Sequence, residues 1–342
     1  MTSKKKHVNI PVFIPHLGCP NMCVFCNQRL ISGVSEFAAD SVRSDIEAVL
    51  STVDRESTEL ELAFFGGSFT GIDRELMTEL LRIGKSYLDS GRIDSMRCST
   101  RSDYINEEIL SILRQYGMRT IELGIQSMDE QVLLSCKRGH DTNTTIEACR
   151  SVIEGGFELV GQMMIGLPGA TLESEIATAE FISQCGACAA RVYPTVVFYD
   201  TELCEMSARG IYTPLTTDEA VERTKTVLDV FDKRSVNVIR VGLCSSENLS
   251  DDEKVYAGAS DVSIGEMAMS ALYLERIEKI LSDYTDLDGK RCVIYGSLGS
   301  VSKISGHRRK NKQTLIEKYG FKSVKILENS ELLGYNIKIS IT

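Results

Sequence analysis

The chain of 342 residues is 43% hydrophobic and 25% charged, with a formal net charge of −10. This composition is typical of a globular protein and weighs against a surface that coats nucleic acid throughout. No run of about 18 apolar residues predicts a membrane span. Residues 1–6 are basic, but no apolar segment with a cleavage site follows them, so we expect no secretory signal. The eleven cysteines then favour a reducing cytoplasm.

Short apolar runs alternate with segments of helical periodicity as far as residue 198. The runs predict six strands, at residues 8–14, 60–65, 96–100, 120–125, 159–165 and 191–198. The segments between them predict helices that include 42–52, 74–88, 107–116, 142–154 and 172–184. Such alternation indicates βα units with a parallel sheet, and the right-handed crossover rule favours a barrel or half-barrel. In such a barrel the chemistry lies at the carboxyl ends of the strands.

The pattern changes after about residue 215. Helices are predicted at 217–231 and 265–281, with a short strand at 238–241 between them. A compact β-α-β-like unit follows, with predicted elements at 291–295, 312–319, 322–327 and 333–339, after a polar linker at 282–289. We therefore expect a core barrel at 1–215, a helical extension packed on it at 216–286, and a small C-terminal α/β unit at 287–342.

The loop after the first predicted strand carries the strongest motif, Cys19-Pro-Asn-Met-Cys23-Val-Phe-Cys26. A C-x3-C-x2-C loop can aim three thiolates at one iron–sulfur cube. Three protein ligands leave one iron open to a chelating group, such as the amino and carboxylate groups of S-adenosylmethionine (SAM). The alternatives are a zinc site completed by His16, or free structural cysteines.

Polar or glycine-rich segments follow the next strands as well. They are Gly66 to Ser68, Ser99 to Asp103, Glu122 to Ser127 with Lys137 to His140 after it, and Gly161 to Gly169. Each alone fits a capped turn between a strand and a helix. With the cysteine loop, however, they form a series at successive strand ends, and that series indicates a barrel mouth lined for a ligand.

These segments resemble the radical SAM superfamily. The later stretches Arg191-Val-Tyr-Pro-Thr195, Thr201-Glu-Leu203 and Arg209-Gly-Ile-Tyr212 are similar to the radical SAM half of the Elongator catalytic subunit and its shorter bacterial relatives. The resemblance covers residues from about 8 to 215, with a looser continuation to about 270. It implies a partial (β/α)6 barrel of the TIM type, a [4Fe–4S] cluster held by Cys19, Cys23 and Cys26, and bound SAM. The C-terminal unit is then a small α+β appendage.

The resemblance also implies a set of SAM contacts. Phe13 lies beside the cluster loop, Gly66, Gly67 and the adjoining Ser68 lie near the methionine amino group, and Ile165 and Gly166 lie near the adenine. The ribose and carboxylate contacts are Thr100, Arg101, Gln126, Arg138 and Gln162. Reductive cleavage of SAM to a 5′-deoxyadenosyl radical, which abstracts hydrogen from a substrate, is the implied chemistry. An electron donor such as flavodoxin or ferredoxin is the implied partner.

The sequence departs from the family in three places. Ser68 stands where many members carry glutamate, and Ala257-Gly-Ala-Ser260 replaces a stretch that contains proline and histidine in near relatives. The 53 residues after Gly289 are too few for the acetyltransferase domain of the Elongator subunit. The full reaction of that subunit on wobble uridine is therefore not implied.

The substrate class remains open among several alternatives. RNA, tRNA in particular, is our first expectation, because the basic segment Ser305 to Lys312 could contact phosphates; a solvated turn is the competing interpretation. A porphyrinogen is the alternative among small molecules, and a methylthiotransferase would normally carry further cysteines before the barrel. The non-catalytic alternative is an iron–sulfur or zinc-binding protein. The separate pair Cys185 and Cys188 has no partner pair, so we expect no second cluster.

Overall fold

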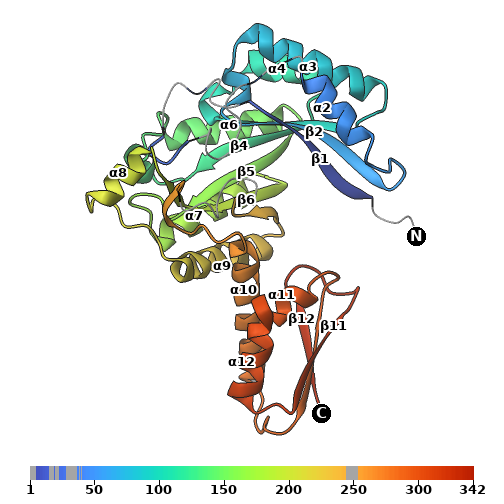
Figure 1. Cartoon of the computed structure of the whole chain (residues 1–342), viewed down its shortest axis with the longest axis vertical. Helices are drawn as coiled ribbons and strands as arrows, with labels where there is room; N and C mark the ends of the chain where they lie inside the picture. The colour runs from blue at the N-terminus through green and yellow to red at the C-terminus, as the bar shows by residue number, and fades with distance from the viewer. Residues whose placement is uncertain are drawn as a thin grey trace.

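A computed structural model of the chain describes residues 5–14, 19, 23–27, 37, 39, 41–243 and 253–342. Its largest part is a seven-stranded parallel sheet with the order β1-β2-β3-β4-β5-β6-β8 (Figure 1). The strands are β1 (Lys6–Phe13), β2 (Thr58–Phe65), β3 (Ser95–Thr100), β4 (Thr120–Gln126), β5 (Glu158–Ile165), β6 (Ala189–Pro194) and β8 (Asn237–Val241). This curled sheet confirms the predicted α/β half-barrel, and the short strand predicted at 238–241 joins it as a seventh strand, β8.

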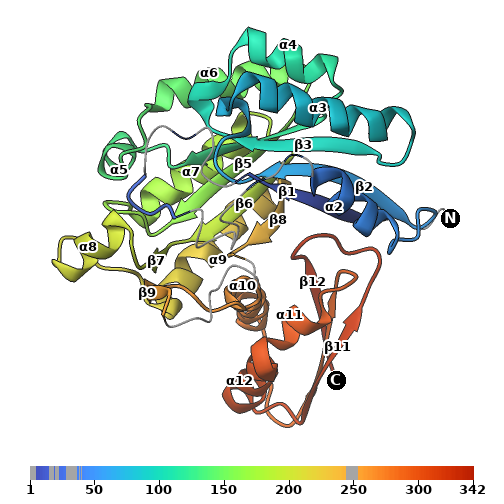
Figure 2. The same ribbon diagram turned by 45° about the horizontal axis from the view of Figure 1, so that its top comes forward.

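Helices cover the outer side of the sheet, as Figure 2 shows for α3, α4 and α6. The main covering helices are α2 (Ser41–Leu50), α3 (Arg74–Asp89), α4 (Glu107–Gln115), α6 (Thr142–Glu154), α7 (Leu172–Gln184) and α9 (Thr217–Lys233). Shorter helices are η1 (Phe69–Gly71), η2 (Ser102–Tyr104), α5 (Glu130–Ser135) and α8 (Glu202–Ala208). Side chains cap several of these helices: Asp73 accepts from two backbone N–H groups of α3, and Asn106 accepts from one of α4.

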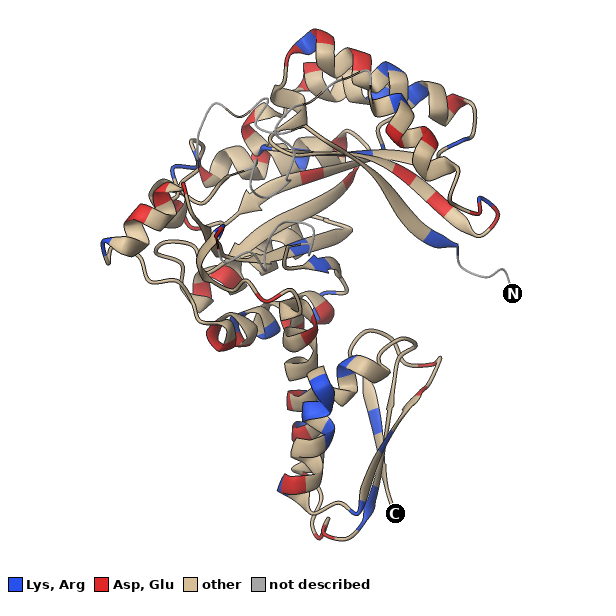
Figure 3. Ribbon diagram, viewed as in Figure 1, with Lys and Arg blue, Asp and Glu red and all other residues tan. Residues whose placement is uncertain are grey.

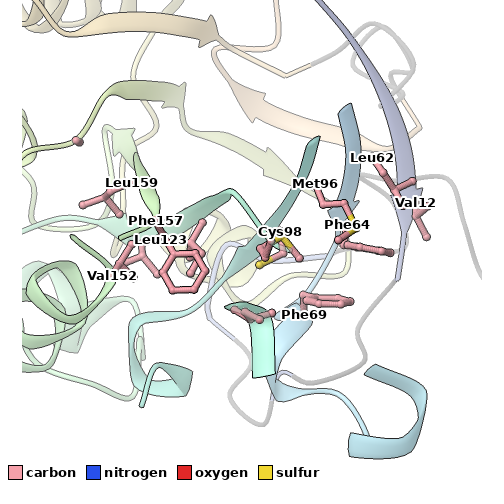
Figure 4. Close-up of a cluster of buried hydrophobic side chains, with 14 of the residues drawn as sticks. Val12, Leu62, Phe64, Phe69, Met96, Cys98, Leu123, Val152, Phe157 and Leu159 are labelled. Carbon is pink, nitrogen blue, oxygen red and sulfur yellow. The ribbon is translucent and has the colours of Figure 1, made fainter. Parts of the chain in front are cut away.

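The main core lies between the sheet and these helices. Figure 4 shows part of it, where Phe64 of β2 and Phe69 of η1 stack with ring centroids 4.5 Å apart. Met96 and Cys98 of β3 lie in the same cluster and are fully buried. Strands with apolar residues on the outer face pack against amphipathic helices, which leaves the inner face of the curled sheet to other side chains.

The expected strand at 191–198 divides into two. Strand β6 ends at Pro194, which has no N–H group to continue the ladder. The chain then forms β7 (Val196–Phe198), which pairs antiparallel with β9 (Val255–Gly258) outside the main sheet. The single-strand prediction for this segment was therefore wrong, and the break brings β7 over the carboxyl end of the barrel.

A second, smaller part follows helix α10 (Ile264–Leu281), with its own three-stranded sheet in the order β11-β10-β12. Its elements are β10 (Arg291–Gly296), α11 (Val301–Ser305), η4 (His307–Arg309), α12 (Lys310–Tyr319), β11 (Ser323–Glu328) and β12 (Ile337–Ile341). Tyr273, Ile277 and Leu281 of α10 share a separate hydrophobic core with Ile294 and Phe321. The last strand starts four residues later than predicted, because Gly334 has a φ of +56° and lies in a turn. Within the described residues, no helix is both long and apolar enough to cross a bilayer.

Candidate cofactor site

A cavity of about 280 Å³ opens at the carboxyl ends of the barrel strands. Its wall includes eleven of the fourteen residues predicted from the sequence: Phe13, Cys19, Cys23, Cys26, Gly66, Gly67, Thr100, Arg101, Gln126, Arg138 and Gln162. Ser68, Ile165 and Gly166 lie beside this wall but do not line it. Residues up to 149 positions apart in the chain therefore meet around one space, as the strand-end series predicted.

The described part of the cysteine loop is tied to the barrel by backbone hydrogen bonds. The N–H of Val24 donates to the carbonyl of Cys136 at 3.1 Å, and the N–H of Leu203 donates to the carbonyl of Val24 at 2.8 Å. The Val24 side chain is buried with Val132 of α5 and Leu203 of α8. These contacts fix the turn between Cys23 and Cys26, whose N–H donates to the Cys23 carbonyl at 2.9 Å.

Two guanidinium groups converge on the buried thiol of Cys23. Nη1 of Arg138 lies 3.5 Å from the Cys23 Sγ, and Nη1 of Arg101 lies 3.9 Å from it. Asp103 holds Arg101 through two hydrogen bonds of 2.8 Å, while Nη2 of Arg138 donates to the Gly124 carbonyl at 2.5 Å. Each cation faces the Cys23 sulfur and is fixed from behind, so positive charge is held against this thiol.

Burial raises the pKa of the Cys19 thiol above its ordinary value, and the positive charges of Arg101 and Arg138 oppose that rise. The Nε of Arg138 is buried and has no hydrogen-bond partner among the described residues. An unpaired buried donor on the side chain that contacts Cys23 fits a group that carries negative charge. Across the described ranges, however, no three His, Cys, Asp or Glu side chains already stand as a metal site. His16, the possible zinc ligand, lies outside the described residues.

The Gly66-Gly67 turn requires glycine for steric reasons. Gly66 has a φ of +87°, and a Cβ atom there would lie 3.0 Å from the Ile14 carbonyl oxygen. Ser68 follows with a fully buried hydroxyl that shares a 2.7 Å hydrogen bond with Thr100 and accepts from the Arg101 N–H at 3.2 Å. Ser68 therefore holds the end of β3 in place beneath the cavity wall.

Gln126 also has a left-handed backbone, with a φ of 66°, where the pairing of β4 and β5 shifts register. A Cβ atom on Gly124 would lie 2.9 Å from both the Arg138 Nη2 and the Gln126 Nε2. Glycine at this position allows both side chains to approach the strand. The bulge then turns the Gln126 side chain toward the cavity, which it lines.

The predicted motif at the end of the fifth strand, β5, makes contacts that stabilise the fold. Ile165 is fully buried in the core. Gly166 donates its N–H to Glu175 at 2.7 Å and accepts from the Tyr212 hydroxyl at 2.6 Å. Arg223 pairs with Glu175 at 2.6 Å, and burial raises the pKa of this carboxyl although the Gly166 N–H and Arg223 oppose the rise. Neither Glu175 nor Arg223 was predicted from the sequence to have a role.

The inner face of the barrel holds a ladder of buried charges, which we call the Glu122 ladder. Glu122 is fully buried and is bound by Arg97 at 2.6 Å, by Arg191 at 3.0 Å and by the amide of Gln162 at 2.8 Å. Arg97 reaches on to Glu61, which also accepts from Ser95 at 2.9 Å. The ladder members are Glu61, Arg97, Glu122, Gln162 and Arg191, one from each strand from β2 to β6.

The ladder was missed as a unit, although one signal could have found it. Each charged member of the ladder stands between two apolar residues of its strand, and such positions in a parallel sheet point into the barrel. The ladder ends at the cavity wall, where the Arg191 guanidinium lies 5.3 Å from the centroid of the Phe65 ring. Tyr193 lines the same wall, and burial raises the pKa of its phenol while Arg191 opposes the rise.

The fold and this cavity define an α/β half-barrel protein with a cysteine-lined pocket at the carboxyl ends of its strands. The profile of the radical SAM superfamily matches residues 13–182, and the profile of the radical SAM C-terminal domain matches residues 188–275. The chain belongs to the radical SAM superfamily.

Relatives of known description include proteins related to the Elongator subunit. The tRNA uridine(34) acetyltransferase of Methanocaldococcus infernus is 29% identical over 197 residues, 51% of this chain and 36% of that protein. Human Elongator complex protein 3 is 24% identical over 254 residues, 63% of this chain and 46% of that protein. An uncharacterised protein of Methanocaldococcus jannaschii is 30% identical over 223 residues, 62% of this chain and 68% of that protein.

The solved structure of M. infernus Elp3 with an N-terminal deletion supports the fold. It matches with a TM-score of 0.61 at 21% identity, over 81% of this chain and 64% of that one. The chain spans less than half of the two relatives with a described role. Both family profiles stop before β10, so the C-terminal sheet lies outside them.

Replacement of Cys19, Cys23 or Cys26 by alanine should abolish iron binding. A cluster left with two protein thiolates is poorly held, so we expect about four irons per chain in the anaerobically reconstituted wild type and far fewer in each variant. Iron analysis and the spectrum of the reduced protein measure this. The double change Cys185→Ala with Cys188→Ala is the control and should leave iron content unchanged. Full iron retention by Cys23→Ala would exclude the cluster assignment.

Replacement of Glu122 by alanine should strongly destabilise the barrel. The change leaves Arg97 and Arg191 buried without their shared carboxylate, which costs about 3–5 kcal/mol of unfolding free energy. Glu108→Ala is the matched control, because Glu108 makes an ion pair with Arg74 at the surface, where about 1 kcal/mol or less is expected. Denaturant unfolding of both variants compares the two losses. Equal losses would mean that the ladder does not stabilise the barrel.

Proposed function

We propose that this protein is a radical SAM enzyme that holds a [4Fe–4S] cluster through Cys19, Cys23 and Cys26 and binds SAM in the adjoining cavity. One observation carries the proposal: the three cysteines line the same cavity as Gly66, Gly67 and Gln126. A zinc-binding or electron-carrier protein needs the thiols but has no need of a glycine-lined wall beside them. With both groups bound, reductive cleavage of SAM supplies a 5′-deoxyadenosyl radical that abstracts hydrogen from the substrate.

The residues of the chain bind and orient. Arg101 and Arg138 stabilise thiolate charge at Cys23, and the unpaired Nε of Arg138 offers a further donor. Gly66 and Gly67 leave backbone groups accessible to the SAM amino group, while Gln126 and Gln162 offer side-chain amides to its ribose or carboxylate. Phe65, Phe198 and Leu243 line the cavity as well and exclude water from the reacting atoms.

The predicted SAM contacts fall into two groups in our proposal. Phe13 and Thr100 line the cavity, so we propose direct contact with the cofactor. Ser68, Ile165 and Gly166 are proposed instead to position the wall, because each is held by partners behind it. Flavodoxin or ferredoxin is the proposed electron donor, since the cluster must receive one electron at a time.

We propose that the substrate is RNA. The relatives with a described role include tRNA uridine(34) acetyltransferases, and the part of the chain outside the family profiles is basic. Residues 287–342 contain eleven Lys and Arg and four Asp and Glu, a net charge of +7 in a chain of −10. The proposed division is a barrel at 1–215, an extension at 216–286 and an RNA-binding unit at 287–342.

Gln126→Ala should weaken SAM binding and leave iron content intact. The removal of one hydrogen bond predicts an affinity lower by about 2- to 12-fold, which equilibrium binding with the reconstituted protein measures. Gln184→Ala at the exposed end of α7 is the control. Unlike Gln126→Ala, Arg138→Ala should lower iron retention in addition to SAM affinity, because the Arg138 guanidinium contacts Cys23. Unchanged SAM affinity in Gln126→Ala would contradict the proposed SAM site. A wild-type protein that retains its iron but does not cleave SAM reductively would contradict the proposed reaction.

Neutralisation of the basic turn should weaken tRNA binding. Arg308, Arg309 and Lys310 are exposed beside Lys312 at the start of α12. Changing all four to Gln should reduce the slope of log affinity against log salt by about one unit for each phosphate that the protein no longer neutralises. Titration of labelled tRNA at two salt concentrations measures this, and reductive SAM cleavage without substrate should continue.

The control for the basic turn changes four exposed cations elsewhere, Arg82, Arg114, Lys233 and Arg234, to Gln. These residues lie on α3, α4 and the end of α9. A control whose salt dependence falls as much as that of the turn variant would show that total charge, and not this turn, determines binding.

A further inference from the structure

The sheet β11-β10-β12 has one covered face and one open face. Cys292, Ile294, Val324 and Ile339 point into the core formed with α10, α11 and α12. Figure 1 shows these helices together on one side of the sheet. Because side chains alternate along a strand, the residues between these buried ones share the opposite face.

The open face is basic and has an aromatic ring near one end of its central strand. Its members are Arg291, Val293 and Tyr295 of β10, Ser323, Lys325 and Leu327 of β11, and Lys338 and Ser340 of β12. Arg291, Lys325 and Lys338 are exposed, and no ion pair of theirs occurs among the described residues. The side chains of this face therefore include three cations and no carboxylate, and Figure 3 shows blue segments on these strands.

The register places the ring beside two of these cations. Tyr295 lies directly across from Lys338 on one side and from Leu327 on the other. Lys325 lies across from Val293, one alternation further along the same face. Neighbouring strands are about 4.8 Å apart, so Lys338 is next to Tyr295 and Lys325 is diagonal to it, while Arg291 lies four residues along β10, about 13 Å away. Tyr295 is half-buried, which fixes the ring and leaves part of it accessible.

We infer that this open sheet face binds single-stranded RNA, with Tyr295 stacking on a base and Arg291, Lys325 and Lys338 contacting phosphates. Single strands are bound in general by aromatic side chains on a sheet and by cations that follow the backbone. An acidic peptide would satisfy the cations but would have no need of the ring beside them. The inference rests on the proposed function in naming RNA, and it adds a surface apart from both the cavity and the basic turn.

The test measures binding of a labelled single-stranded RNA of about 12 nucleotides, within the length that one such surface can take. Tyr295→Ala should lower affinity by about 5- to 150-fold, the effect of removing one stacked base, and Tyr295→Phe should retain it. Lys325→Gln with Lys338→Gln should reduce the salt slope by about 1.4, at about 0.7 per phosphate on a single strand. Cross-linking of RNA that contains a photoreactive uridine should label the peptide with residues 291–296.

Two control variants and two further measurements keep the outcomes distinct. Tyr284→Ala removes an exposed ring elsewhere, and Arg82→Gln with Lys233→Gln removes two exposed charges elsewhere; neither should weaken RNA binding by more than about 2-fold. Reductive SAM cleavage without substrate should be the same in all variants, since the barrel cavity is unchanged. A melting curve for each variant reports whether it is folded.

Each contrary result has a separate meaning. Equal RNA affinity in wild type, Tyr295→Ala and the double lysine variant would overturn this inference and leave the basic turn as the RNA-binding segment. Competition by polyglutamate as strong as by RNA, with no effect of Tyr295→Ala, would assign the face to an acidic protein and also overturn it. If the wild-type protein cleaves SAM but does not bind single-stranded RNA, the inference is overturned and the proposed cofactor chemistry stays intact.

Discussion

The structure depends on one buried interaction, the carboxylate of Glu122 between the guanidinium groups of Arg97 and Arg191. None of these charges could remain in the barrel alone, because an unpaired charge at such depth costs several kcal/mol. Their pairing joins β3, β4 and β6 through side chains, in addition to the backbone ladder. The ladder occupies the inner face where an apolar core would otherwise lie, and it forms the polar floor of the cavity. Because these side-chain pairs join strands of the sheet, the strand ends around the cavity are held in one arrangement.

Two parts of the cavity wall carry positive charge, and only one of them depends on the ladder. On the cysteine side, Arg101 and Arg138 are anchored to Asp103 and to the Gly124 carbonyl, so their charge toward Cys23 does not depend on the ladder. At the other part, Arg191 belongs to the ladder and also lies over Phe65. The cavity wall therefore offers positive charge to the Cys23 sulfur and, at Arg191, a neutralised cation beside an aromatic surface.

Local spacing revealed the cysteine loop, the Gly66-Gly67 turn and the strand-helix alternation, because these depend on neighbours in the chain. The Glu122 ladder could not be assembled in that way, since Glu122 pairs with residues 25 and 69 positions distant. The roles of Ser68 and Gly166 likewise became visible only from Thr100 and Glu175, which the fold brings behind them. The break after Pro194 was readable from proline alone, but its consequence, the pairing of β7 with β9, depends on a distant strand.

Charge is divided between the parts of the chain, and the division constrains how a polyanion can approach. Residues 1–286 hold 27 Lys and Arg and 44 Asp and Glu, a net charge of −17, against +7 for residues 287–342. A polyanion is attracted to the second part and repelled by most of the first, within a Debye length of about 8 Å at physiological salt. Helix α10 joins the parts: Arg276 pairs with Asp229 and Asp232 of α9, and Tyr273, one turn earlier, belongs to the C-terminal core. A polyanion held by the basic part is thus held at a fixed direction from the barrel, because a continuous, doubly anchored helix connects the two.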